Sequence, residues 1–205
     1  MRRLCDRFLS NKFFSRVYRM TGVNKVLRDP PEPTPRIIWI FWAQGEEAAP
    51  DVVKLCIESW RENNSDWIVK VLNKNSIKQY VTTDDLPENI SWTPFSDILR
   101  IQLLAEYGGV WADASTYCAQ PLSNWLPQLM SAGFFAYSAP GRDRLISSWF
   151  MASHKGSPII EEMDASIKRY WAFHRNGAHT YFWLHYLFNM KQLTSRRFRR
   201  QLYFM

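Results

Sequence analysis

Two carboxylates and one guanidinium stand close together in residues 95–115, where a helix and a strand would bring them to one place. Asp97 and Arg100 are three residues apart, so on a helix they share one face. The residues around them are apolar, and Gly108 and Gly109 end the segment with the residue type that a left-handed C-terminal cap favours. Two charges on a mostly apolar helix need partners, and a polar ligand is one candidate.

Asp113 follows residues 110–112, a short apolar run that predicts a buried strand. Open α/β sheets bind their ligands at the carboxyl ends of strands, so the sequence places Asp113 where a ligand is expected. Taken alone, each feature favours a plainer interpretation, because Asp97 and Arg100 also suit an ordinary ion pair and an acid often begins a turn. The combination favours a binding site.

The same residues resemble a known family. Ser-Asp-x-x-Arg at 96–100, then Tyr-Gly-Gly at 107–109 and Asp-x-Ser at 113–115, is similar to the donor-binding core of glycosyltransferases with a DxD motif. The resemblance is strongest to the capsular polysaccharide synthesis family, and it runs from about residue 36 to about residue 188. It implies a GT-A-like nucleotide-diphospho-sugar transferase fold and a hexosyltransferase that uses a nucleotide-sugar donor.

The resemblance also implies roles for single residues. Asp113 would bind a divalent cation, Mn²⁺ or Mg²⁺, which as a Lewis acid stabilises the departing diphosphate. Asp97 and Arg100 would hold hydroxyl groups of the donor sugar, and with Asp113 they are the expected catalytic residues. Ser115 stands where the motif has its second acid. Either Asp113 holds the cation with Ser115 or water completing the set, or the dependence on metal is reduced.

Three further residues are expected on the donor side. Trp39 and Trp42 lie at the end of the first predicted strand, where related enzymes stack the nucleotide base, although both side chains also suit packing within a sheet. Gln44, beside Gly45, would let the backbone approach the nucleotide.

The remaining motif evidence narrows the class of enzyme. His179 and His185 lie in the last segment, where such transferases often contact the donor phosphate or the metal, but no His-x-x-x-His pair occurs and structural or surface roles are expected. The serine-hydrolase, zinc-protease and P-loop signatures are also missing, which removes those common classes.

Length and composition indicate one α/β domain. The chain has 205 residues, 46% of them hydrophobic, with ten tryptophans, which suits a single packed core and argues against wholesale disorder. Cys5, Cys56 and Cys118 are widely spaced and predict neither a disulfide framework nor a zinc site. No apolar run of about 18 residues and no secretory signal is found, so we expect a cytoplasmic protein.

The formal charge of +7 is concentrated at the two ends of the chain. Residues 1–28 hold eight basic side chains and one acid among apolar residues, which is typical of an amphipathic helix at a membrane surface. A nucleic-acid patch and a solvated helix packed on the domain are the alternatives. We expect peripheral contact with the inner face of the membrane and no nucleic-acid partner. The basic residues 191–205 suit a frayed terminus and a lipid contact equally.

The expected organisation is a basic helical arm at 1–28, a proline-rich linker at 29–35, a transferase domain at 36–190 and a basic tail at 191–205. The domain is expected to hold a mostly parallel sheet flanked by helices. Expected strands are 36–42, 67–72 and 110–112, with a hairpin of 134–137 and 147–151 around Pro140-Gly141. Expected helices are 50–63, 76–81, 157–175, 179–190 and one that begins at Phe95.

Two functions follow from these features. The first is a glycosyltransferase that transfers a hexose to a saccharide or lipid-linked acceptor in capsular or surface polysaccharide biosynthesis. The second is a catalytically inactive, transferase-like nucleotide-sugar-binding or scaffold protein. The second is favoured by Ser115, and by the expectation that family members commonly continue beyond the position of Phe188, where this chain has only its basic stretch.

Overall fold

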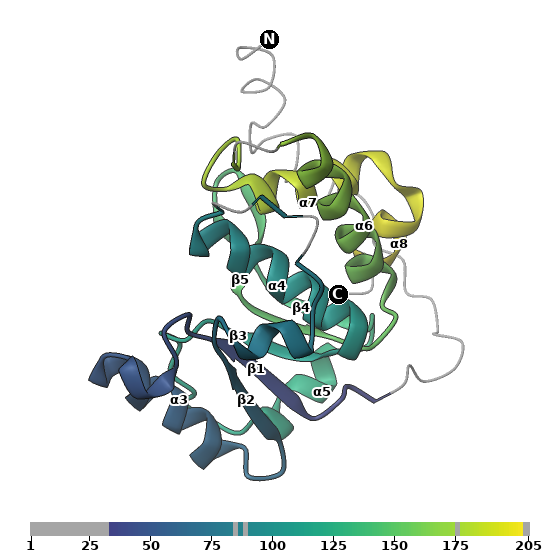
Figure 1. Ribbon diagram of the computed structural model, residues 1–205. Helices are drawn as coiled ribbons and strands as arrows, with labels where there is room; N and C mark the ends of the chain where they lie inside the picture. The colour runs from purple at the N-terminus through teal and green to yellow at the C-terminus, as the bar shows by residue number, and fades with distance from the viewer. Residues whose placement is uncertain (1–32, 84–85, 88–89, 175–176, 203–205) are drawn as a thin grey trace.

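The computed structural model describes residues 33–83, 86–87, 90–174 and 177–202, which form an α/β fold around one sheet (Figure 1). The sheet has the strand order β2-β1-β3-β5-β4. The strands are β1 (Ile37–Phe41), β2 (Ile68–Leu72), β3 (Gly109–Ala112), β4 (Phe134–Gly141) and β5 (Arg144–Ser153). The predicted arm at 1–28 and most of the linker at 29–35 lie outside the described residues.

The sheet is mixed, whereas the sequence predicted a mostly parallel one. β1 pairs in parallel with β2 and with β3, but β3 with β5 and β5 with β4 are antiparallel. The reason is the hairpin: a tight turn can join only antiparallel strands, and β5 inserts between β3 and β4.

The central strands are buried on both faces because helices cover the sheet from both sides. In β1, Ile38 and Ile40 face one core and Trp39 and Phe41 face the other. This two-sided burial explains why the strand reads as a continuous apolar run and not as an alternating one.

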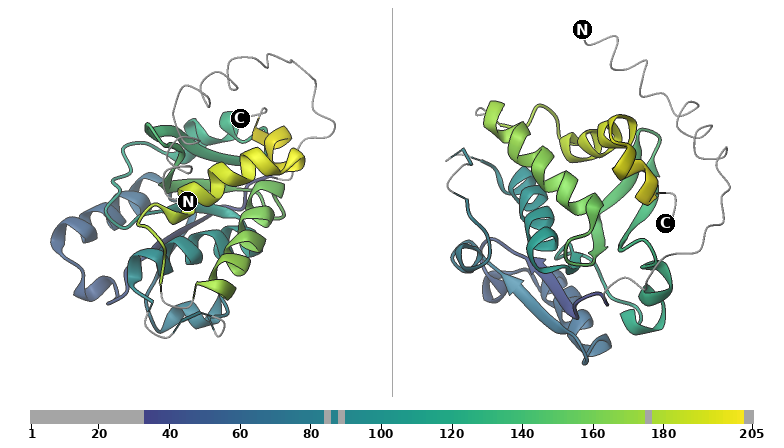
Figure 2. Two further views of the ribbon diagram at one scale, coloured as in Figure 1. Left: turned by 90° about the horizontal axis from the view of Figure 1, so that it is seen from above. Right: turned by 90° about the vertical axis from the view of Figure 1, so that its right-hand side faces the viewer.

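One face of the sheet carries α3 (Asp51–Asn63) and the short α5 (Leu126–Leu129). The opposite face carries α4 (Trp92–Tyr107), which packs against β1, β3 and β5 (Figure 1). On the same side lie α6 (Pro158–Phe173), α7 (Trp183–Thr194) and α8 (Arg196–Leu202), which pack against one another (Figure 2). Of these, α6 packs against α4 and α7 packs against β5. Three 3₁₀ turns complete the described elements: η1 (Glu46–Ala48), η2 (Ser76–Gln79) and η3 (Leu122–Asn124).

The helix that carries Asp97 and Arg100 begins at Trp92, three residues before the predicted start at Phe95. Pro94 lies in the first turn of this helix. Proline is tolerated there because the backbone N–H groups of a first turn have no hydrogen-bond partner within the helix. The helix therefore gains one turn, and Trp92 and Thr93 reach the cleft described below.

The glycine pair ends α4 as predicted and fixes the start of β3. Gly108 and Gly109 both have positive φ, of 68° and 95°. A Cβ on Gly109 would lie 2.5 Å from the carbonyl oxygen of Ile37, so only glycine lets β3 approach β1 this closely. The position of Asp113, four residues later, depends on this contact.

Other boundaries also differ from the prediction. β4 continues through Pro140 to Gly141, and the turn of the hairpin falls after it, because β4 is an edge strand with bulges where a missing N–H leaves no ladder bond unpaired. α7 begins at Trp183, later than the predicted 179, and extends to Thr194.

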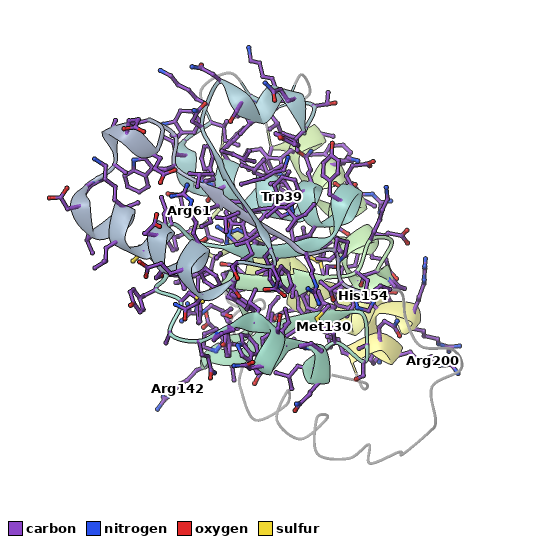
Figure 3. All side chains as sticks on the ribbon, turned by 90° about the horizontal axis from the view of Figure 1, so that it is seen from below. Trp39, Arg61, Met130, Arg142, His154 and Arg200 are labelled. Carbon is purple, nitrogen blue, oxygen red and sulfur yellow. The ribbon has the colours of Figure 1, made fainter. Side chains whose placement is uncertain are left out.

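Residues 191–202 belong to the folded core of the described chain. They complete α7 and form α8, whose Phe198 is fully buried and packs edge-on against Phe188 at 4.8 Å between ring centroids. The basic side chains of this segment point outward, as Arg200 does at the edge of the molecule in Figure 3. Among the described residues, no helix has both the length and the apolar character needed to span a membrane.

Substitution Phe198→Ala is expected to lower the free energy of unfolding by about 3–5 kcal/mol, because it leaves a cavity between α7 and α8. Chemical denaturation measures the change. Phe173→Ala is the matched control, since Phe173 is 80% exposed and should change stability by less than about 0.5 kcal/mol. Equal stabilities of the two variants would contradict the packing of α8.

Candidate active site

A cleft of about 420 Å³ opens at the carboxyl ends of the parallel strands β1 and β3. The segment after β1 forms one wall, and the segment after β3 forms the floor. The first turns of α4, Ser148 of β5 and the residues around the start of α7 close the other sides. This is the edge at which open α/β sheets bind ligands.

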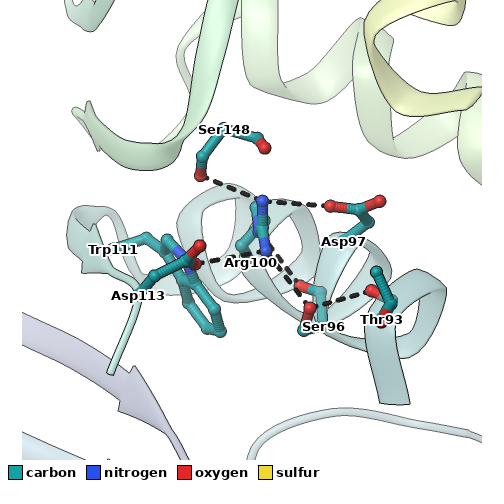
Figure 4. Close-up of polar contacts among 7 residues, drawn as sticks. All are labelled: Thr93, Ser96, Asp97, Arg100, Trp111, Asp113 and Ser148. Carbon is teal, nitrogen blue, oxygen red and sulfur yellow. Dashed lines mark hydrogen bonds and ion pairs between the residues drawn. The ribbon is translucent and has the colours of Figure 1, made fainter. Parts of the chain in front are cut away.

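Asp113 lies on the floor of the cleft, one residue beyond β3. Its Oδ1 accepts a hydrogen bond of 2.7 Å from Nε1 of Trp111 and one of 3.3 Å from Nη2 of Arg100 (Figure 4). Its backbone N–H donates to the carbonyl of Trp149 at 2.8 Å. Oδ2 accepts no hydrogen bond from the described residues, and the side chain is 35% exposed, so this oxygen is accessible to a ligand.

Arg100 is buried and has a partner at every nitrogen of its guanidinium. Nη1 lies 3.0 Å from Oδ1 of Asp97 and donates to the carbonyl of Ser148 at 3.0 Å, while Nη2 contacts Asp113. Nε and Nη2 also donate to the carbonyl and hydroxyl of Ser96. The guanidinium lies over the ring of Trp111, 5.1 Å from its centroid. Arg100 thus holds Asp97 and Asp113 in position, and it would bind a sugar hydroxyl only by releasing one of these partners.

Asp97 is buried beside Arg100 and lines the cleft. Burial raises the pKa of its carboxyl to about 6; the positive charge of Arg100 lowers it and the negative charge of Asp113 raises it. A carboxyl with a pKa near neutrality at the wall of a cleft is typical of functional sites.

The structure brings together most of the predicted site residues. Trp42, Gln44 and Ser115 line the cleft together with Asp97, Arg100 and Asp113. Trp39 does not: it is buried in the core, its Nε1 donates to the carbonyl of Gly108 at 2.9 Å, and its ring packs against two tyrosines (Figure 3). Trp39 lies in the middle of β1, whereas the cleft begins at its carboxyl end, so Phe41 and Trp42 reach the cleft and Trp39 does not.

His185 is a cleft residue that the sequence analysis assigned to structural or surface roles. Burial and the positive charges of Arg100 and Arg144 together lower its pKa to about 4, against the opposing effect of Asp143. It is therefore neutral at pH 7, and its buried Nδ1 has no hydrogen-bond partner in the described chain. In the sequence, His185 is a single histidine on a mostly apolar helix. A histidine buried in an ordinary core shows the same pattern.

Among the described residues, no three His, Cys, Asp or Glu side chains cluster as a set that could hold a metal ion. Asp113 and Ser115 supply one carboxylate and one hydroxyl. Mg²⁺ in nucleotide enzymes is commonly held by one or two carboxylates together with the phosphates of the substrate. The donor set fits a cation that is shared with a diphosphate.

Removing the central charge tests whether the three groups act as a unit. Arg100→Met is expected to destabilise the fold by about 3–5 kcal/mol, because it leaves the Asp97 carboxylate buried without its partner. The double variant Asp97→Asn with Arg100→Met is expected to be more stable than this single variant, since the unpaired charge is gone. Denaturant midpoints measure both, and a double variant with purely additive losses would argue against the coupling.

The two shifted pKa values predict opposite effects of pH on stability. The pKa of Asp97 rises from 3.8 to about 6 on folding, so its stabilising contribution is complete below pH 3.8 and is lost as the pH rises through 6. The pKa of His185 falls from 6.5 to about 4, so its contribution is complete above pH 6.5 and is lost as the pH falls through 4.

In the native protein these contributions oppose each other between pH 4 and 6. In His185→Gln, the free energy of unfolding is expected to fall as the pH rises from 4 to 6. In Asp97→Asn, it is expected to rise over the same range. Denaturation midpoints at intervals from pH 4 to 7 give both slopes. Identical slopes in the two variants would show that neither group titrates as described.

Comparison with known proteins agrees with this geometry. The chain is 25% identical over 164 residues to the O-glycosyltransferase braB of Annulohypoxylon truncatum, covering 69% of this chain and 39% of that protein. It is 27% identical over 157 residues to the putative glycosyltransferase HOC1 of Saccharomyces cerevisiae, covering 65% and 39%. The chain thus spans about two fifths of the length of these curated relatives.

A solved structure, the PaToxG glycosyltransferase, shares the fold with a TM-score of 0.53 at 17% identity, over 85% of this chain and 75% of that one. The family model for capsular polysaccharide synthesis proteins matches residues 5–203. The match extends beyond the motif at 96–115 to almost the whole chain. The chain belongs to the capsular polysaccharide synthesis protein family.

Proposed function

We propose that this chain is the donor-binding domain of a GT-A-type glycosyltransferase, which transfers a hexose from a nucleotide sugar to a saccharide or lipid-linked acceptor in capsular or surface polysaccharide synthesis. The observation that carries the proposal is Asp113, which presents Oδ2 to a 420 Å³ cleft at the carboxyl ends of two parallel strands. Its other oxygen is held by Arg100 and Trp111. Family membership and curated relatives named as glycosyltransferases support the same class.

The proposed reaction replaces one bond at the anomeric carbon of the donor. The acceptor hydroxyl oxygen forms a bond to that carbon, while the bond from the carbon to the diphosphate oxygen breaks and the diphosphate leaves with the electron pair. The hydroxyl proton is released to the diphosphate or to water. The products are the extended acceptor and a nucleoside diphosphate.

The side chains of the cleft divide this work between binding and positioning. Trp42 offers an aromatic face for the base, and Asp97 and His185 line the wall with groups that can hydrogen-bond to hydroxyls. Arg100 keeps Asp113 and Asp97 fixed, so their geometry is set before the donor binds. A Mn²⁺ or Mg²⁺ ion held by Asp113 and Ser115 would neutralise charge on the departing diphosphate.

The alternative is a protein that binds the nucleotide sugar without turnover. Ser115 favours it, because a neutral hydroxyl lines the cleft where the motif has a second acid.

For residues 1–28 we keep the proposal of peripheral contact with the inner, cytoplasmic face of a membrane, on the evidence of their eight basic residues. Vesicle co-sedimentation at low and high salt, compared with a protein that begins at Pro35, tests that contact.

Thermal stabilisation by UDP-, GDP- and CDP-hexoses, with and without Mn²⁺, tests donor binding directly. A ligand at 100 times its dissociation constant stabilises the native state by about 2.7 kcal/mol. Donor hydrolysis then separates the enzyme from the inactive binding protein. Absence of stabilisation by every donor would contradict both versions of the proposal.

Asp113→Asn is expected to lower transfer by about 100-fold or more, because an amide is a poor ligand for a cation and carries no charge. Stability is expected to change by less than about 1 kcal/mol, since the amide oxygen still accepts the bonds from Trp111 and Arg100. Glu106→Gln is the matched control, an exposed carboxylate at the far end of α4 whose ion pair with Lys155 spans 4.0 Å. Transfer at the native rate in Asp113→Asn would remove Asp113 from the mechanism.

A further inference from the structure

A second cavity, of about 340 Å³, lies beside the cleft and is walled by aromatic rings. Trp60, Leu122 and Phe150 are buried at its base. Its outer walls are exposed aromatic rings, which is unusual because large apolar side chains outside a core often mark a binding surface. The rings are Tyr117 at 57% exposure, Tyr137 at 41% and Trp149 at 40%.

Trp149 and Tyr137 form a stacked aromatic pair. Their rings are stacked with centroids 4.9 Å apart and an angle of 16° between the planes. Tyr137 also packs against Phe150 at 5.7 Å and Trp125 at 6.4 Å, and Trp125 lies 5.6 Å from Phe150. The stack is therefore supported from behind and is rigid before any ligand arrives, which reduces the entropy lost on binding.

None of the side chains that line this cavity carries a charge. Burial raises the pKa of Cys118 and of Tyr137, so both are neutral at pH 7. The hydroxyl of Thr116 and the amide of Gln120 are the polar side chains at its lining besides the tyrosines. A phosphate-bearing donor finds no countercharge here, whereas a neutral ring with an apolar face and hydroxyl groups finds both partners it needs.

Only the thickness of one backbone separates this cavity from the cleft. Ser115 lines the cleft and Thr116 lines the cavity; on β5, Ser148 lines the cleft and Trp149 lines the cavity. The two segments are joined where the N–H of Asp113 donates to the carbonyl of Trp149 at 2.8 Å. A ligand in this cavity is therefore separated from the cleft at Asp113 by a single layer of backbone.

We propose that the surface formed by Trp149, Tyr137 and Tyr117 binds a pyranose ring of the acceptor, so that the acceptor of this transferase is a neutral saccharide. The proposal rests on the proposed function, since it places the second substrate beside the donor cleft. The sugar ring stacks its C–H face on the side of Trp149 that Tyr137 leaves uncovered and directs its hydroxyls to Thr116 and Gln120. An acceptor of more than one sugar unit would pass around the separating segments to bring its reactive hydroxyl into the donor cleft.

Saturation-transfer NMR with methyl glucoside, methyl galactoside and methyl mannoside tests the surface without any need for turnover. At least one glycoside is expected to receive saturation from the native protein. Trp149→Ala and Tyr117→Ala are each expected to weaken its binding by about tenfold, which corresponds to about 1.4 kcal/mol. Phe173→Ala, a matched exposed aromatic outside both cavities, is expected to bind as the native protein does.

Three results would overturn the proposal: no glycoside binds the native protein, Trp149→Ala and Tyr117→Ala bind as well as the native protein, or all three variants lose binding equally. A native dimer that Trp149→Ala converts to a monomer, seen by analytical ultracentrifugation, would assign the surface to a second copy of the chain instead. Near-UV circular dichroism of each variant confirms that the fold is retained, and Tyr117→Ala carries the test if Trp149→Ala does not fold.

Donor binding, measured on the same proteins by thermal stabilisation, separates failure of this proposal from failure of the proposed function. If the native protein binds a glycoside but no nucleotide sugar, the acceptor surface stands and the transferase assignment falls. If it binds a nucleotide sugar but no glycoside, the transferase assignment stands and the acceptor surface falls. When transfer is assayed, Trp149→Ala is expected to raise KM for the saccharide about tenfold while donor affinity changes less than about twofold.

Discussion

The buried guanidinium of Arg100 joins three elements that are distant in the sequence: its own helix α4, the end of β3 through Asp113, and β5 through the carbonyl of Ser148. A buried cation is costly unless each of its donors has a partner, and here each nitrogen has one. The fold satisfies this condition only when α4, β3 and β5 stand at one relative position. The geometry of Asp113 is therefore set by the same contacts that keep Arg100 paired.

The close approach of backbone atoms imposes a second constraint on the position of Asp113. Gly109 allows β3 to approach Ile37 of β1 more closely than any side chain would permit, and Gly108 reverses the chain at the end of α4. A shift of β3 by a fraction of an ångström would lengthen the contact between Asp113 and Arg100, which is already 3.3 Å. The glycine pair after the end of α4 and Arg100 near its middle therefore act on one distance.

The sequence predicted those parts of the fold that local physics decides. The apolar run of β1, the cap at Gly108 and the three-residue spacing of Asp97 and Arg100 are local patterns, and the structure contains each of them. The antiparallel pairing of β5 with β3 was not predicted. The strand of a hairpin that pairs with the rest of the sheet is decided by tertiary packing, and the hydrophobic pattern of the sequence does not show it. Trp39 was predicted with Trp42 as a donor contact because the sequence does not show how far along the strand the cleft reaches.

His185 was missed for a similar reason. Its position on α7 predicts burial, and whether a buried imidazole faces a core or a cleft depends on how the helix packs over β5, which is a tertiary property. The aromatic surface around Trp149 is also tertiary, since its three exposed rings come from β4, β5 and the segment after β3.

Charge divides the two cavities in a way that suits two different substrates. The cleft holds Asp97, Arg100 and Asp113, and the neighbouring cavity has no charged side chain in its lining. Neighbouring residues of the two separating segments line different cavities. Ser115 and Ser148 line the cleft, and Thr116 and Trp149 line the uncharged cavity. With two carboxylates and one guanidinium, the cleft would hold an anionic diphosphate only together with a cation, whereas a neutral ligand needs no countercharge in the cavity. The hydrogen bond from Asp113 to Trp149 fixes the two walls relative to each other, so the fold sets the distance between the cleft and the cavity.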